Sequence, residues 1–284
     1  NVKAAIEKFD DIVNIPCASH TLQLSITYGL KTIEATIKQC KELIAHLSGN
    51  KKRQELQEAQ KATGVQNPVD VIKPIDIRWN SMYFALERLV LLERPIRWLE
   101  NTLSNGVRYE SRKEGTKLQE FLPRSSTFET LSKLIPLLKP FEKTTRLLGG
   151  ENYCTLSLVT PAIEILIQNL KNSTSNDDDD NIVQTMRKSL LENLEERWHV
   201  PSDYGLYASF LDPRFKALSF ISLAKRHTIH NDIKYQFNKL KDSIADSCEE
   251  NNLDSTQLSQ LQQSQSLMAE LFSEPIVQQQ DTNT

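Results

Sequence analysis

Hydrophobic residues in this chain recur mostly at spacings of three and four, which predicts a chain made largely of helices. The clearest series runs from Ser19 to Gly49 and predicts one long amphipathic helix that ends at the glycine. A shorter helical pattern covers residues 1–9, and β-branched residues over 12–15, just before Pro16, predict a short strand. The apolar positions of the long series are Leu22, Ile26, Leu30, Ile33, Ile37, Cys40, Ile44 and Leu47.

Breaker residues divide the next stretch. Residues 51–61 are charged and Gln-rich, which predicts a solvated helical extension, and residues 63–74 predict a loop. A helix is expected from Trp79 to about residue 93, where Pro95 should break it. Residues 101–126 hold two glycines, a proline and several basic side chains, so they predict a loop. This loop is either a solvated linker or a segment that contacts phosphates.

The second half of the chain predicts further helices. The segment 156–170 is apolar on most faces, which indicates a core position. Pro136 and Pro140 predict a kink or a break in the helix that contains them. Residues 172–181 include four consecutive Asp and predict a solvated loop, because no Gly or Glu completes a calcium loop. The helices are expected over residues 127–148, 156–170, 182–198 and 228–247.

Composition narrows the class of protein. The chain has 284 residues, 39% hydrophobic and 25% charged, as in one large soluble domain or two modest ones. The net charge is −3, so any contact with DNA must come from a local patch rather than from a globally basic chain. No apolar run reaches the roughly 20 residues that span a membrane. The chain starts without Met or a signal peptide, which predicts a piece of something longer.

The cysteines predict neither disulfides nor zinc. Four cysteines in 284 residues form no disulfide framework, and the simplest interpretation is reduced thiols in a cytosolic or nuclear protein. Cys17 and His20 form half of a zinc pattern, and the only other close pair is His227 with His230. A structural zinc needs a second pair of ligands, so no zinc is expected.

An unusual group of polar residues surrounds Trp79. Asp76 and Arg78 precede it, and Asn80 and Ser81 follow it. A Trp face can stack on a nucleobase, and an Arg fork can grip a phosphate. The alternative is that Asp76 caps a helix in which Trp79 is a core anchor.

Two further stretches carry candidate chemistry. His20 is expected in the first turn of its helix, where it either bonds to nearby backbone or stands near an active site. Residues 208–216 contain an Asp-Pro turn signal followed by Arg214 and Lys216, which are polar positions that could face an anion.

Several motifs occur in a definite order. They are Cys-x-x-His at 17–20 followed by Leu-x-Leu, Arg-Trp-Asn-Ser at 78–81 and Leu-Asp-Pro-Arg-Phe-Lys at 211–216, with the stretches 137–141 and 156–161 between the last two. This order resembles the hAT superfamily of DNA transposases and their domesticated relatives with BED-type zinc fingers. The resemblance extends to about residue 225. It implies a ribonuclease-H-like core that is split by an all-helical insertion domain.

The expected fold class is therefore mainly α. It comprises a partial ribonuclease-H-like core remnant over residues 1–50, a helical insertion domain over 51–250 and a polar, disordered tail over 251–284. In such transposases the Trp is associated with stacking on a base flipped out at a DNA hairpin, which favours the stacking interpretation of Trp79. The DNA-binding residues expected from the resemblance are Arg78, Trp79, Asn80, His20, Arg214 and Lys216.

The departures from the family pattern concern catalysis. The family uses two Asp and one Glu to hold two divalent metals. This chain begins just past the second Asp, and it lacks both the Ser-Glu-Arg-like motif of the Glu and the zinc finger. We therefore expect no catalytic residue, metal site or cofactor here, whereas the parent protein would use Mg²⁺ or Mn²⁺ and zinc.

The function implied is a DNA-handling fragment of a nuclear cut-and-paste transposase that is not catalytic alone. The parent would bind transposon ends with hairpin or unpaired bases, form a homo-oligomer through a missing C-terminal region and contact no membrane. The rival interpretation is a domesticated regulatory or protein-interaction module.

Overall fold

The structure is a computed structural model that describes residues 15–75, 79–150, 156–172, 181–198 and 203–250. Within these ranges every regular element is helical, which confirms the mainly α class. The chain divides into two compact units, residues 1–221 and 222–284. No helix in the described part is long and apolar enough to cross a membrane. The elements are α2 (Ala18–Leu30), the 3₁₀ turn η1 (Lys31–Ile33), α3 (Glu34–Leu47), α4 (Asn50–Ala62), α5 (Trp79–Ser104), α6 (Tyr109–Phe121), α7 (Ser125–Leu148), α8 (Leu156–Asn172), α9 (Asn181–Arg197), α10 (Asp203–Leu211) and α11 (Leu223–Glu250).

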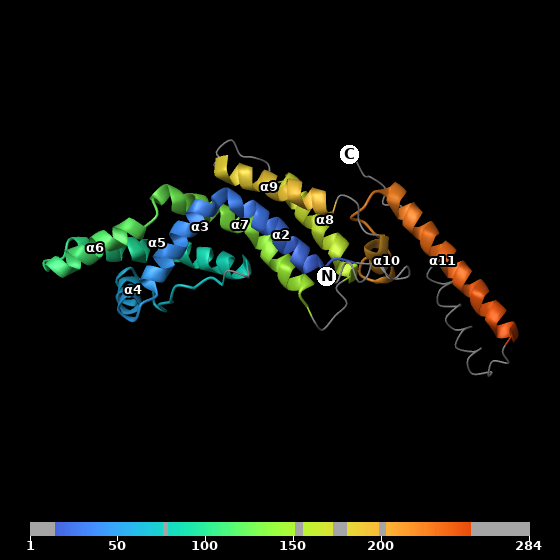
Figure 1. Cartoon of the computed structure of the whole chain (residues 1–284), viewed down its shortest axis with the longest axis horizontal. Helices are drawn as coiled ribbons and strands as arrows, with labels where there is room; N and C mark the ends of the chain where they lie inside the picture. The colour runs from blue at the N-terminus through green and yellow to red at the C-terminus, as the bar shows by residue number, and fades with distance from the viewer. Residues whose placement is uncertain (1–14, 76–78, 151–155, 173–180, 199–202, 251–284) are drawn as a thin grey trace, which may run out of the picture. The chain divides into compact units, whose positions relative to one another are not determined.

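The prediction of one long helix from Ser19 to Gly49 is wrong in the middle of this range, where the 3₁₀ turn η1 separates α2 from α3. Gly29 near the end of α2 is buried, and a Cβ placed on it would lie 2.5 Å from Leu190 of α9. The glycine therefore permits a close approach of α2 and α9, which lie side by side in Figure 1. Thr32 Oγ1 donates to Gly29 O at 2.8 Å and satisfies a carbonyl beside the break.

The extension over 51–61 is helical, as predicted, but it is a separate helix and is not fully solvated. Gly49 is extended and precedes a separate helix, α4. Lys52 is buried there, and its Nζ lies 2.9 Å from Glu55 and 2.7 Å from Glu114 of α6. A buried Lys is retained because carboxylates pair with it.

Two breaker signals do not break the chain. Pro95 lies inside α5, which continues to Ser104, because Ile96 and Leu99 bury their side chains beyond it. The region 101–126, expected to be a loop, contains α6. A Cβ on Gly115 of α6 would lie 2.5 Å from Ser104 N, so this glycine marks close packing of α5 and α6 rather than a turn.

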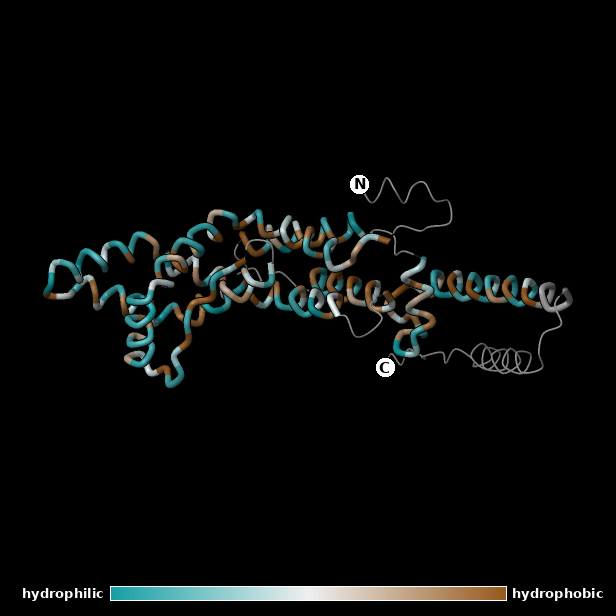
Figure 2. The backbone as a smooth tube through the Cα atoms, turned by 60° about the horizontal axis from the view of Figure 1, so that its bottom comes forward, coloured by the Kyte–Doolittle hydropathy of each residue, from teal (hydrophilic) through white to brown (hydrophobic). Residues whose placement is uncertain are grey.

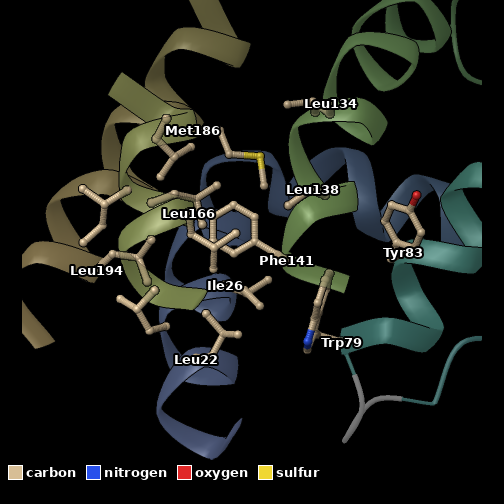
Figure 3. Packing of buried hydrophobic residues seen from close by; sticks show 14 of the residues in the cluster. Leu22, Ile26, Trp79, Tyr83, Leu134, Leu138, Phe141, Leu166, Met186 and Leu194 are labelled. Atoms are coloured by element: carbon tan, nitrogen blue, oxygen red, sulfur yellow. The ribbon is translucent and has the colours of Figure 1, made fainter. Parts of the chain in front are cut away.

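The helices pack around two hydrophobic clusters. The first joins α2, the start of α5, the C-terminal half of α7, α8 and α9 (Figure 3), and the second joins α3, α4, most of α5, α6 and the start of α7. Figure 2 shows hydrophobic and hydrophilic positions alternating along the turns of these helices. The helices α5 and α7 contribute to both clusters, so they carry the packing from one to the other.

Several expectations are confirmed or remain open. The helices predicted over 156–170 and 182–198 match α8 and α9 within two residues. The helix over 1–9, most of the strand over 12–15, the loop over 173–180 and the tail from 251 lie outside the described residues. The domain boundary at 50 stays a prediction, and residues on both sides of it contribute to the second cluster.

Candidate nucleic-acid site at the start of α5

Residues 63–75, called the strap below, connect α4 to the segment before α5. Polar side chains of α4 and α5 hold the strap in place through hydrogen bonds and an ion pair. The Gln60 side chain of α4 pairs with the backbone of Val69 through two hydrogen bonds of 2.9 Å, from its Nε2 to Val69 O and from Val69 N to its Oε1. The Asp70 carboxylate forms an ion pair with Arg53, and Asp70 O accepts a 2.7 Å hydrogen bond from Arg88 of α5. The strap is therefore tied to both helices before it reaches residue 75.

Ser81 of α5 forms two hydrogen bonds with the last described residue of the strap, Ile75. Its Oγ accepts a hydrogen bond from Ile75 N at 2.8 Å and donates one to Ile75 O at 2.9 Å. These two bonds join the ends of the segment 76–78, which contains Arg78 and lies outside the described residues. Ser81 therefore ties Ile75 to the first turn of α5, a role that the sequence interpretation did not assign to it.

Trp79 is buried at the first position of α5, with 6% of its surface exposed. Its ring lies near Ile26 of α2 and Phe141 of α7 (Figure 3). The indole Nε1 donates to Thr145 Oγ1 of α7 at 3.2 Å. The partly exposed ring required by the stacking interpretation is not found, because the amphipathic pattern after Trp79 turns this face of α5 into the first cluster.

The remaining edge of Trp79 borders a pocket of about 140 Å³ at the seam between the two clusters. The lining combines a tryptophan, aliphatic residues and the polar residues Gln23, Thr27 and Lys41. An apolar pocket with a few polar groups is the usual form of a small-molecule or base site. The lining residues are Gln23, Thr27 and Leu30 of α2, Ile37 and Lys41 of α3, Ile75 of the strap, and Trp79 and Met82 of α5.

The polar groups beside Trp79 differ in whether they have a hydrogen-bond partner. Asn80 Oδ1 is buried and has no hydrogen-bond partner among the described residues. Tyr83 donates to Glu87 Oε1 at 3.2 Å, and burial together with the Glu87 charge raises the pKa of the tyrosine to about 12. Tyr83 is therefore a neutral donor at physiological pH, and Asn80 retains an unused acceptor.

The Cys17–His20 pair lies at the start of α2. Both residues are exposed, and Cys17 is a free thiol. Across the described ranges, no three His, Cys, Asp or Glu residues lie close enough together to hold a metal ion. His20 does not line the pocket, although Gln23 and Thr27 of the same helix do.

The turn after α10 is organised by Asp212. Ser157 Oγ at the start of α8 donates to Asp212 Oδ2 at 2.7 Å, and Arg214 donates to both carboxylate oxygens at 3.0 and 2.6 Å. The Arg214 and Ser157 donors hold the pKa of the Asp212 carboxyl well below its usual range. The Arg214 guanidinium also lies 5.3 Å from the Phe215 ring centroid.

A neighbouring hydrogen bond explains why α8 tolerates a proline. Pro161 has no N–H, so the carbonyl of Ser157 lacks its donor within the helix. Ser209 of α10 is fully buried, and its Oγ donates to Ser157 O at 2.8 Å. The hydroxyl replaces the missing donor and fixes α10 to the start of α8.

The predicted site residues are thus divided between different places. Of those that the structure describes, only Trp79 lines the pocket; Asn80 follows it in α5, and Arg214 is engaged by Asp212. The polar residues that do line it, Gln23, Thr27 and Lys41, were not singled out in the sequence. Their only signal was a polar residue beside the apolar stripes of α2 and α3.

Comparison with known proteins gives two kinds of match. Residues 15–121 match the family model of the ZBED1 RNase-like helical domain. A putative AC transposase of Zea mays is 24% identical over 210 residues, which cover 72% of this chain and 24% of the relative. A putative AC9 transposase of Zea mays is 23% identical over 221 residues, covering 72% of this chain and 26% of the relative. The chain therefore spans about a quarter of the length of these relatives, and no solved structure gives a significant match.

Proposed function

We propose that the chain handles DNA within a cut-and-paste transposase, because the family model and the maize relatives support an hAT-type transposase-like protein. The specific role proposed is the capture of an unpaired base beside Trp79. We also propose that the chain alone does not cut DNA, since the carboxylate motifs of the family are missing from its sequence. The parent protein would act in the nucleus.

The observation that carries this proposal is the pocket beside Trp79. The pocket has a volume of about 140 Å³, and Trp79 is one of its lining residues. The Gln23 amide can hydrogen-bond a base edge, and the Lys41 ammonium can attract a phosphate or a carbonyl oxygen. The Trp79 ring itself is held by Thr145 and the core, so it forms a rigid wall rather than a free stacking face.

Filling the pocket tests this role. Thr27 is exposed at the pocket rim, and its Oγ1 bonds to Gln23 O at 2.9 Å within α2. The variant Thr27→Phe should place a ring in the pocket without disturbing the core. We expect the full chain to bind a DNA hairpin with one unpaired base more tightly than a paired duplex, and Thr27→Phe to remove this preference. Loss of one base contact corresponds to roughly 5- to 150-fold in affinity, measured by fluorescence anisotropy.

Thr116→Phe is the matched control. Thr116 is also an exposed helical threonine, and its Oγ1 bonds to Arg112 O at 3.1 Å, but it lies on α6 away from the pocket. This variant should keep the preference of the parent chain. Equal affinity of the parent for hairpin and duplex, or an unchanged preference in Thr27→Phe, would contradict base capture. Binding of neither DNA would favour the rival role as a protein-interaction module.

A further inference from the structure

The exposed face of α7 carries a row of positive charge that the pocket does not use. Lys139, Lys143 and Arg146 are all exposed and are spaced four and three residues apart, so they lie on one face of the helix. We call these three residues the α7 basic row. Between Thr130 and Leu148 the helix has four cations, since Lys133 adds to the row, and one acid, Glu142. Glu142 is buried, so the solvent face of this part of α7 is basic.

On other helices of the described part of the chain, some cations pair with acids of the same helix. On α5 and α9 cations pair with acids one turn away, as in Arg97 with Glu93 at 2.8 Å and Lys188 with Glu192 at 3.8 Å. On α7 Arg146 has one such contact, 3.9 Å to Glu142, and 73% of its side chain remains exposed. Because the whole chain has a net charge of −3, the row is a local feature and not a result of general basicity.

We propose that the α7 basic row binds the phosphates of a nucleic-acid strand. This inference rests on the proposed function and adds the surface that would hold the strand while the pocket receives a base. The row spans roughly 10 Å along the helix, a length over which one strand of duplex DNA carries about three phosphates. Lys side chains act as point charges for phosphate, and Arg adds a fork of donors.

The row is also joined to the pocket through one turn of α7. Thr145 lies between Lys143 and Arg146 in the sequence, and its hydroxyl accepts the hydrogen bond from the Trp79 indole. Trp79 in turn forms a wall of the pocket. A strand held on the row would therefore lie on the helix that fixes the pocket wall.

The test uses the full chain with the triple substitution Lys139→Gln, Lys143→Gln and Arg146→Gln. Binding of a fluorescein-labelled duplex is followed by anisotropy over a range of KCl concentrations. Each phosphate contact contributes roughly 0.9 to the slope of log affinity against log salt, so three lost contacts should reduce the slope by roughly 2 to 3. The melting temperature should not change, because the three side chains are exposed.

The matched control is Lys38→Gln, Lys61→Gln and Lys113→Gln, which removes three exposed lysines from α3, α4 and α6. Both variants change the net charge by the same amount, so a difference between them reports position rather than total charge. An unchanged slope in the α7 variant, or equal reductions in both variants, would overturn this inference alone. Failure of the unsubstituted chain to bind either hairpin or duplex would instead overturn the proposed function.

Discussion

The start of α5 around Trp79 and Asn80, called the Trp79 corner, and the turn after α10 around Asp212 both come from motifs expected to face DNA. The two regions differ in how many of their polar atoms have hydrogen-bond partners within the protein. At the turn, every oxygen of the Asp212 carboxylate is taken by Ser157 or Arg214, and Ser209 satisfies the carbonyl that Pro161 leaves without a donor. At the corner, Trp79 makes one polar contact, Asn80 retains a buried acceptor and a pocket lies beside them.

This difference separates structural motifs from candidate sites. A polar cluster whose members satisfy one another stabilises a particular packing and has little left for a ligand. A pocket bordered by a rigid aromatic side chain and a few polar residues is suited to binding. The comparison therefore directs functional tests to the pocket and stability tests to the turn.

The largest expected effect is at Trp79. Trp79→Ala should lower the free energy of unfolding by roughly 3–5 kcal/mol, because it leaves a cavity in the first cluster. Trp98 lies on the same helix and is 40% exposed, so Trp98→Ala should cost about 1 kcal/mol or less. Urea unfolding followed by circular dichroism measures both. Equal losses would show that Trp79 does not anchor the core.

A smaller loss is expected at the Asp212 turn. Ser209→Ala removes the donor for Ser157 O, and an unsatisfied buried carbonyl costs roughly 1–3 kcal/mol. Ser132→Ala is the comparison, since Ser132 is exposed and its hydroxyl bonds only to Phe128 O within α7. Its unfolding free energy should change by about 0.5 kcal/mol or less. A cost at Ser209 no larger than this would argue against the role assigned to its hydroxyl.

The Asp212 carboxylate should make stability depend on pH. Its pKa is lowered in the folded state, so its contribution is present above the ordinary carboxyl pKa of 3.8 and is lost as the pH falls further. Asp212→Asn should therefore be less stable than the parent near neutral pH. The two unfolding free energies should converge as the solution is acidified below about pH 4. Parallel curves down to low pH would contradict this role.

The smallest stability effect is expected at Ser81, and it tests the corner rather than the turn. Ser81→Ala removes two hydrogen bonds at an exposed position, which should cost roughly 0.5–1.5 kcal/mol. Because Ser81 ties Ile75, which lines the pocket, to the first turn of α5, the variant should also weaken the hairpin preference. Anisotropy and urea unfolding on the same preparation provide the two values. A preference equal to that of the parent would show that this closure does not serve binding.

The helical class and the best helices could be predicted because their apolar periodicity is strong. The apolar positions of α8 and α9 recur over four turns with few interruptions, so local pattern and packing agree. The helix α6 was missed because its buried face is small, and its two buried residues are Gly115 and Leu118. A glycine that permits close packing of helices looks in sequence like a glycine that makes a turn.

The candidate site was predicted less completely. The series of Met82, Tyr83, Leu86 and Leu89 already indicated that Trp79 faces the core, whereas the family resemblance favoured an exposed ring. Lys41 and Gln23 could not be identified, because they join Trp79 only after α2 and α3 separate at η1. Such contacts depend on tertiary packing, which local spacing does not encode.

The bonds from Ser157 to Ser209 and Asp212 also bear on where the chain can be divided. They connect residues 52 and 55 positions apart. A fragment that stops after α9 would keep α8 but leave the Ser157 carbonyl and hydroxyl to find water in an apolar setting. The segment with the family-model match ends even earlier, at residue 121, and would also lack α7 with its Thr145 partner for Trp79. The natural unit for expression and crystallisation therefore extends at least to the end of the Asp212 turn, and shorter fragments should be prone to proteolysis and aggregation.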